Sequence, residues 1–365
     1  MTKLFTKSFS FLFLFLFFAV KIQNVRAQDV DSTLLKGLKI NGYIDFYYSW
    51  DTDKDKSLRQ FALFNTYRDQ FKLNIAQVSF SYNSENVRGK ATFQYGDIPK
   101  ALYPANEQEI QEANIGMSPL KHLWIDFGYF ISHIGFESLP INNFFSSYSI
   151  GSYPQPLYQS GLKIGYDFSE KLWGCLHILN GFNVLADNNK NKSFGFELTY
   201  KPSSIITFDY NSILGNEMPD EMPFKLRFYN DLVTSYSPSN KLDLILDLNY
   251  ATQEKSKISD PTASANMLSF TLSGRYKITP KYYISLRGSY LNDPDGFLSG
   301  VYVNTDANLS GLKCFGFTGA LEYRPIDNCY FRLESTLLVA DSKLKIFYDN
   351  SNTRTEINLN TGIQF

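Results

Sequence analysis

The sequence predicts an all-β protein, a transmembrane up-and-down antiparallel β-barrel of about sixteen strands, with fourteen to eighteen allowed. Apolar and polar residues alternate with a period of two after residue 28, and short polar turns alternate with long loops. The 365 residues carry 35 basic and 36 acidic side chains, and their mean hydropathy is −0.24. This composition excludes a bundle of membrane-spanning helices, and the near-neutral charge argues against a nucleic-acid binder.

Residues 1–27 predict a secretory signal peptide. Lys3 and Lys7 form a basic start, residues 9–20 an apolar core, and Val25-Arg26-Ala27 a small-residue end. The alternative is a transmembrane anchor, but the apolar run is short for one. Without this segment the chain has 31 basic and 36 acidic residues, a net charge of −5.

Residues 28–37 are interpreted as a short periplasmic lead and residues 38–365 as the barrel. The alternation is clearest in four expected strands, 38–50, 87–95, 242–250 and 268–276. Each has one apolar and one polar surface, as expected of strands between lipid and water. In 71–82 the alternation changes phase near Ala76-Gln77, which predicts a β-bulge.

The connections distinguish a barrel from a soluble sandwich, which also alternates. Seven short polar turns are expected at 83–86, 118–121, 169–171, 201–204, 237–240, 279–281 and 325–328. Longer loops are expected at 51–70, 131–156, 253–266 and 293–311. Counting the strands around seven turns gives about sixteen, an even number typical of closed bacterial barrels.

Aromatic residues recur at the ends of the expected strands. These tyrosines are Tyr48, Tyr82, Tyr95, Tyr129, Tyr166, Tyr200, Tyr250, Tyr276, Tyr290 and Tyr323. We expect them to form aromatic girdles at the two membrane interfaces, the alternative being core aromatics of a soluble β protein. The last strand ends in Phe365, which resembles the signal recognised by the barrel assembly machinery, so we expect that machinery and outer-membrane lipid as partners.

Several segments together resemble one known family. They are 135–137, 142–149, 180–183, 187–190, 192–195, 287–290, 293–297, 322–325 and 332–334. The chain resembles the OmpL-like β-barrel porins common in Bacteroidetes, from about Gly42 to Phe365. The resemblance implies an integral barrel in the outer membrane of a Gram-negative cell, with a channel role. The chain departs from the family pattern at Phe182 and Ser289, where Trp and Glu are expected.

Charged residues on the polar faces are the expected lining of the lumen. The pore-lining set is Arg88, Lys90, Asp126, Lys163, Glu197, Asp209, Asp243, Asp247, Arg275, Arg287, Glu322, Arg332 and Glu334. The arginines either create a field across a pore or pair with neighbouring acids, and the sequence leaves both open. We expect passive diffusion of small hydrophilic solutes or ions; the alternative is a plugged surface barrel for structure or interaction. Assembly into a homo-oligomer also stays open.

The segment 131–156 is unusually aromatic for a loop. We expect it to fold inward as a constriction loop, with Glu137, Phe144, Phe145 and Tyr148 in the pore. The alternative is an external cap or a surface for a partner.

Enzymatic chemistry has little support in the sequence. His122, His133 and His177 fall on a turn, a loop and a strand, with no nucleophile motif or metal-ligand pattern nearby. An outer-membrane hydrolase pairing His133 with Ser132 or Ser146 is therefore only the third candidate. We expect no catalytic residues, no cofactor and no metal, and three cysteines are too few for a disulfide framework.

Overall fold

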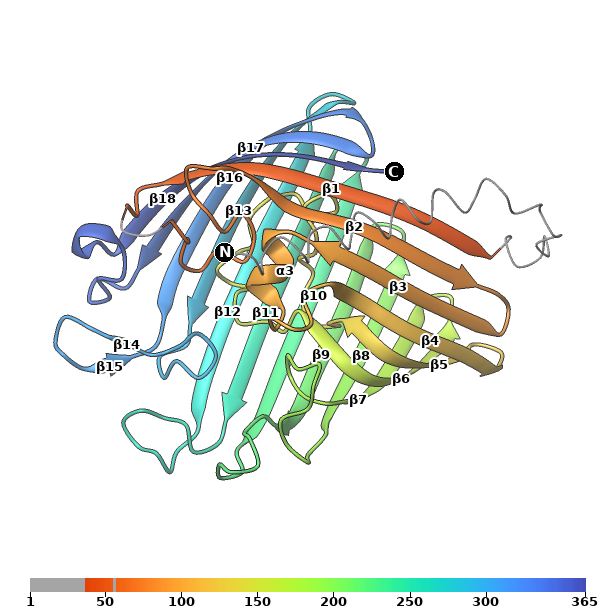
Figure 1. Ribbon diagram of the computed structural model, residues 1–365, viewed down its shortest axis with the longest axis horizontal. Coiled ribbons are helices and arrows are strands. Elements are labelled where there is room, and N and C mark those ends of the chain that lie inside the picture. The colour runs from red at the N-terminus through yellow and green to blue at the C-terminus, as the bar shows by residue number, and fades with distance from the viewer. Residues whose placement is uncertain (1–36, 55–56) are drawn as a thin grey trace, which may run out of the picture. The chain divides into compact units, whose positions relative to one another are not determined.

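The computed structural model describes residues 37–54 and 57–365, which form a closed antiparallel barrel of sixteen strands (Figure 1). Neighbouring strands follow the chain order, and β1 pairs with β18 to close the barrel. The barrel strands are β1 Leu38–Asp51, β2 Phe71–Asn83, β3 Val87–Tyr95, β4 Ile110–Leu120, β5 Leu123–Ile131, β6 Tyr158–Ser169, β7 Leu172–Leu179, β8 Ser193–Ser203, β9 Ile206–Asn216, β10 Leu226–Ser239, β11 Leu242–Gln253, β12 Ala265–Lys277, β13 Tyr282–Asn292, β16 Lys313–Ile326, β17 Cys329–Ala340 and β18 Thr353–Gln364. The predicted fold class and strand number are confirmed.

Three smaller elements lie in the long connections. The helix α3 Asp97–Leu102 follows β3, the strands β14 Tyr302–Val303 and β15 Leu309–Ser310 form a separate pair, and the 3₁₀ turn η2 Tyr348–Asn350 precedes β18. The sequence interpretation did not include α3. Tyr47 donates a hydrogen bond from Oη to Asp97 Oδ2 at 2.7 Å, which fixes the start of this helix against β1.

The expected signal peptide, residues 1–27, lies outside the described residues, as does the expected lead except for residue 37. Among the described residues, no helix has the length and apolarity needed to span a membrane.

Short and long connections occupy opposite ends of the barrel (Figure 1). The seven predicted polar turns join β2 to β3, β4 to β5, β6 to β7, β8 to β9, β10 to β11, β12 to β13 and β16 to β17. The four predicted long loops all lie at the other end. Four further connections at that end, after β3, β7, β9 and β17, complete the up-and-down order.

The two faces of the wall differ as the alternation predicts. On β12, Leu268, Phe270 and Leu272 point outward and are 36–52% exposed, whereas Ser269 and Thr271 point inward and are fully buried. An apolar outer face suits hydrocarbon, and closing the sheet leaves no unpaired backbone edge within the membrane. Tyr282 and Tyr323 stack on adjacent strands with ring centroids 5.0 Å apart, consistent with outward aromatic clusters near the strand ends.

The expected irregularity in β2 is visible in the order of its buried and exposed residues. Asn74 and Ile75 are consecutive and both fully buried, after which Gln77, Ser79 and Ser81 return to the inner face. The ladder to β3 begins only at Ala76. The phase change therefore falls within two residues of its predicted place.

Candidate functional site

The residues predicted to line a pore lie on the inner face, in two groups that the sequence does not separate. The group toward the short-turn end is partly exposed except for the buried Asp126, and consists of Arg88, Lys90, Asp126, Lys163, Glu197, Asp209, Asp243 and Arg275. The group buried beneath loops is Asp247, Arg287, Glu322, Arg332 and Glu334. Space beside the first group includes a cavity of about 230 Å³ near Arg88, Asp126 and Lys163. We call this short-turn half of the lumen the vestibule.

Opposite charges in the vestibule are mostly paired between strands that are adjacent or one strand apart. Arg88 donates from Nε to Asp126 Oδ1 at 2.6 Å, and Lys90 pairs with Glu112. Arg275 Nη2 lies 3.1 Å from Asp243 Oδ2. Of the two interpretations left open for Arg275, Arg287 and Arg332, Arg275 shows the pairing with a neighbouring acid.

The loop of residues 132–157, here called the inner loop, is held inside the barrel by buried charges of β17. The Glu334 carboxylate accepts the backbone N–H of Ser146 at 2.7 Å and of Ser147 at 3.2 Å. Arg332 donates to the carbonyl oxygens of Pro140 at 3.2 Å and Asn143 at 3.0 Å. Charge-assisted bonds of this kind to backbone groups fix the path of the loop more firmly than neutral ones.

A second attachment joins the inner loop to β13. Arg287 Nη1 lies 2.7 Å from Glu137 Oε1, and both side chains are at most 2% exposed. The same guanidinium donates to Ser147 O at 2.9 Å and lies 4.4 Å from the centre of the Phe145 ring. Glu137 also accepts the backbone N–H of Ser149 at 2.9 Å, so this carboxylate joins wall and loop.

The remaining expected constriction residues also contact the wall or other loops. Arg275 stacks over Phe144 at 4.5 Å from the ring centre, and Tyr148 packs edge-on against Phe64 of the loop after β1, at 5.4 Å. The backbone approaches β12 so closely at Gly151 that a Cβ there would lie 2.4 Å from the carbonyl oxygen of Phe270. Any other residue at this position would push the inner loop away from the wall.

An apolar cluster fills the lumen toward the long-loop end. Inward residues of the strands, such as Ile213, Met267 and Leu291, pack with loop residues that include Ile150, Phe182 and Phe347. Every strand of the barrel contributes at least one inward side chain that is no more than 8% exposed. One such set is Asp45, Asn74, Thr92, Glu112, Phe130, Gln159, His177, Ser193, Asn211, Asp231, Asp247, Thr271, Ser289, Thr318, Thr336 and Asn358. Packed inward side chains therefore narrow the lumen along every strand.

A buried charge network near the loop after β1 was missed by the sequence interpretation. Arg59 donates to Asp51 Oδ2 at 2.9 Å and pairs with Glu356, which also pairs with Arg354. Glu356 alternates with the apolar Ile357 in β18, so its inward position could have been found from period two. Its partner Arg59 lies on a loop and has no such signal.

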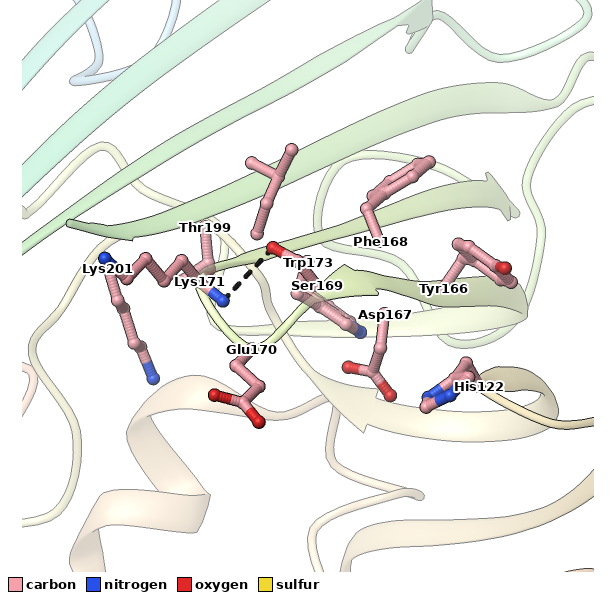
Figure 2. A pocket seen from close by; sticks show the side chains of 11 residues that line it. His122, Tyr166, Asp167, Phe168, Ser169, Glu170, Lys171, Trp173, Thr199 and Lys201 are labelled. Carbon is pink, nitrogen blue, oxygen red and sulfur yellow. Dashed lines mark hydrogen bonds between the residues drawn. The ribbon is translucent and has the colours of Figure 1, made fainter.

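The short-turn rim carries a second hollow, of about 640 Å³, around the turn between β6 and β7 (Figure 2). Figure 2 shows His122 beside Asp167, with Glu170 and Lys171 on the turn itself. Ser169 Oγ accepts the backbone N–H of Lys171 at 3.2 Å, an ordinary turn contact. His122 has a φ of +69°, the left-handed backbone conformation that the turn before β5 uses.

The histidine on the inner loop is paired with neither expected serine. His133 contacts Gln159 Oε1 through Nδ1 at 2.9 Å and Ser212 O through Nε2 at 3.1 Å. Ser146 instead contacts Arg332. Burial, together with the nearby His177, lowers the pKa of His133 to about 4, so the ring is neutral near pH 7. A Ser–His pair for hydrolysis is not formed by these residues.

Comparison with known proteins agrees with the fold. The family model described as "Putative beta-barrel porin-2, OmpL-like" matches residues 37–365. The chain belongs to this family. This OmpL-like porin is thus an integral β-barrel of the outer membrane, as the sequence resemblance implied.

Solved structures with a similar fold have very low sequence identity to the OmpL-like porin. OprB of Pseudomonas putida has 11% identity and a TM-score of 0.61, over 92% of this chain and 96% of that chain. The channel DcaP of Acinetobacter baumannii has 11% identity and a TM-score of 0.60, over 90% and 97%. The anion-selective porin of Comamonas acidovorans has 6% identity and a TM-score of 0.59, over 90% and 99%. No curated protein sequence matches the chain. At these identities the likeness concerns the fold alone.

Proposed function

We propose that this OmpL-like porin allows passive diffusion of small hydrophilic solutes or ions, without a covalent step, and that the inner loop is its constriction. The observation that carries the proposal is the attachment of an aromatic loop to charged wall residues within the lumen, through Arg287, Arg332 and Glu334. A partly open, charged vestibule on the short-turn side supports the same function.

The filling of the lumen by side chains and the inner loop favours a second candidate. Every strand has a buried inward residue, and the apolar cluster and the inner loop fill part of the lumen. Two functions follow from this arrangement: a channel that conducts when the inner loop moves, or a plugged barrel that serves as a surface structure. Recognition of the terminal Phe365 by the assembly machinery, contact with outer-membrane lipid and homo-oligomer formation remain part of the proposal.

Planar-bilayer recording of the purified, refolded mature chain across a salt gradient distinguishes the two candidates. For a channel we expect discrete openings of low conductance, because the inner loop restricts the lumen. A folded barrel that stays electrically silent would favour the plugged barrel.

Asp209→Lys is expected to shift the reversal potential toward anion selectivity, if the vestibule is on the conduction path. Asp209 lies on the inner face of β9, is partly exposed, and accepts a hydrogen bond from Thr199 Oγ1 at 2.5 Å. The substitution changes the charge on the inner wall of the vestibule by two units, and a charge within a narrow lumen is less screened than one in bulk water. Glu85→Lys makes the same charge change on an exposed turn and should have little effect. Equal shifts from both variants would exclude the vestibule as the selective region.

A further inference from the structure

One cluster on the lumen wall has the donor atoms of a metal site, and its three residues come from two strands. Cys175 and His177 are two residues apart on β7 and share its inner face. Glu197 on β8 is the register partner of Cys175. Among the described residues these three form a group in which one ligand atom of each side chain lies within 4.8 Å of the others.

The imidazole of His177 is buried without a hydrogen bond. The residue is 1% exposed, and neither ring nitrogen has a hydrogen-bond partner in the described part of the chain. Leaving a buried polar group unsatisfied is unfavourable, so such a group in a native fold requires an explanation. Nε2 lies 3.4 Å from Glu197 Oε2, without hydrogen-bond geometry.

That separation suits two ligands of one metal ion. With bonds of ~2.0–2.2 Å from zinc to nitrogen and oxygen, tetrahedral geometry places the two ligand atoms roughly 3.3–3.5 Å apart. A bound ion would satisfy one ring nitrogen of His177 and bring Glu197 into a defined position. Thiolate, imidazole and carboxylate together favour Zn²⁺ and related transition metals over Ca²⁺ or Mg²⁺.

The neighbouring side chains hold the His177 ring in place. His133 stacks on it with ring centroids 4.0 Å apart and planes 20° apart, and is itself held by Gln159 and Ser212. Gly195, the register partner of His177, makes room for the stack: a Cβ there would lie 2.9 Å from His133 Cε1. Supporting residues of this kind orient a metal-binding histidine.

We propose that Cys175, His177 and Glu197 bind one divalent transition-metal ion of the zinc class on the lumen wall. Binding converts the Cys175 thiol to a thiolate and releases its proton to water. The side chain of Glu197 is 21% exposed, so the site borders the vestibule and a water molecule or a passing solute takes the fourth position. The site does not depend on whether the barrel conducts.

The test is titration of Zn²⁺ alone into the refolded mature chain in detergent, made without a polyhistidine tag and kept under a metal-free reductant. We expect one ion per chain, and a thiolate-to-metal charge-transfer absorption when Co²⁺ is bound. Cys175→Ser should abolish that absorption, and His177→Gln and Glu197→Gln should each weaken Zn²⁺ binding by at least about tenfold.

Two matched controls keep the test specific. Cys314→Ser makes the same change at a buried inner cysteine of β16, whose Sγ contacts Phe315 O at 3.4 Å as Cys175 Sγ contacts Leu176 O at 3.6 Å. Asp209→Asn removes a nearby inner carboxylate that is outside the cluster. Both should keep wild-type affinity. The absence of stoichiometric binding, or equal affinity in wild type and in a folded Glu197→Gln variant, would overturn the proposal. Heat-modifiable migration on gels verifies that each variant is folded. If Cys175→Ser does not fold, the Glu197→Gln variant still tests the proposal, because Glu197 is partly exposed and its replacement disturbs the barrel wall less.

Discussion

Replacing residues 144–153 with a short Gly-Ser linker is expected to raise single-channel conductance several-fold, or to open a channel that is silent in the wild type. The segment supplies Phe145, Tyr148 and Ile150, which fill the lumen against the wall and the loop after β1. Its removal uncovers the polar side chains of Arg287, Glu334 and others, which water then solvates. Planar-bilayer recording measures the result.

Shortening an exposed loop gives the matched control for that experiment. Residues 260–262, between β11 and β12, are exposed, and replacing them with one Gly should leave conductance unchanged. Arg287→Met is a smaller version of the main change, because it leaves Glu137 with the Ser149 N–H as its remaining bond and loosens the loop. Unchanged conductance in a folded variant lacking 144–153 would exclude the inner loop as the constriction.

Leu272→Arg is expected to lower the free energy of unfolding by about 2–4 kcal/mol, because it places a charge on the lipid-facing side of β12 near the bilayer midplane. Leu272 is 52% exposed and is adjacent to the central residue of the strand, Thr271. The measurement is the urea dependence of folding in lipid vesicles.

Depth along the strand provides the control for this substitution. Ile278 is also an exposed apolar residue, and it directly follows the last residue of β12. Because it lies near the membrane interface, Ile278→Arg should lower the free energy of unfolding by no more than about 1 kcal/mol. Equal costs for the two variants would contradict the assignment of the outer wall to lipid.

Much of the barrel was predictable because its determinants are local. The two-residue alternation indicates which side chains share a face, as it does for Leu268, Phe270 and Leu272 of β12. Turns that contain Pro or Ser indicate where the chain reverses. For that reason the sixteen strands and seven short turns follow from the sequence. The membrane adds a requirement independent of residue identity, since an open sheet edge is too unfavourable in hydrocarbon.

The candidate sites needed contacts between residues far apart in the chain. Period two places Arg287 and Glu334 on the inner face, yet gives no sign that one pairs with Glu137 and the other accepts the N–H of Ser146. The inward path of the loop was expected only from its aromatic content, because loop residues have no periodicity to read.

The sequence by itself determined the class of the fold, the strand order and the inner and outer faces, because these depend on alternation and on solvent. Only the tertiary structure decided that the inner loop is attached to the lumen wall and that Cys175, His177 and Glu197 meet. Strand register and loop packing set those distances, and both depend on the closure of the whole barrel, which no local pattern encodes.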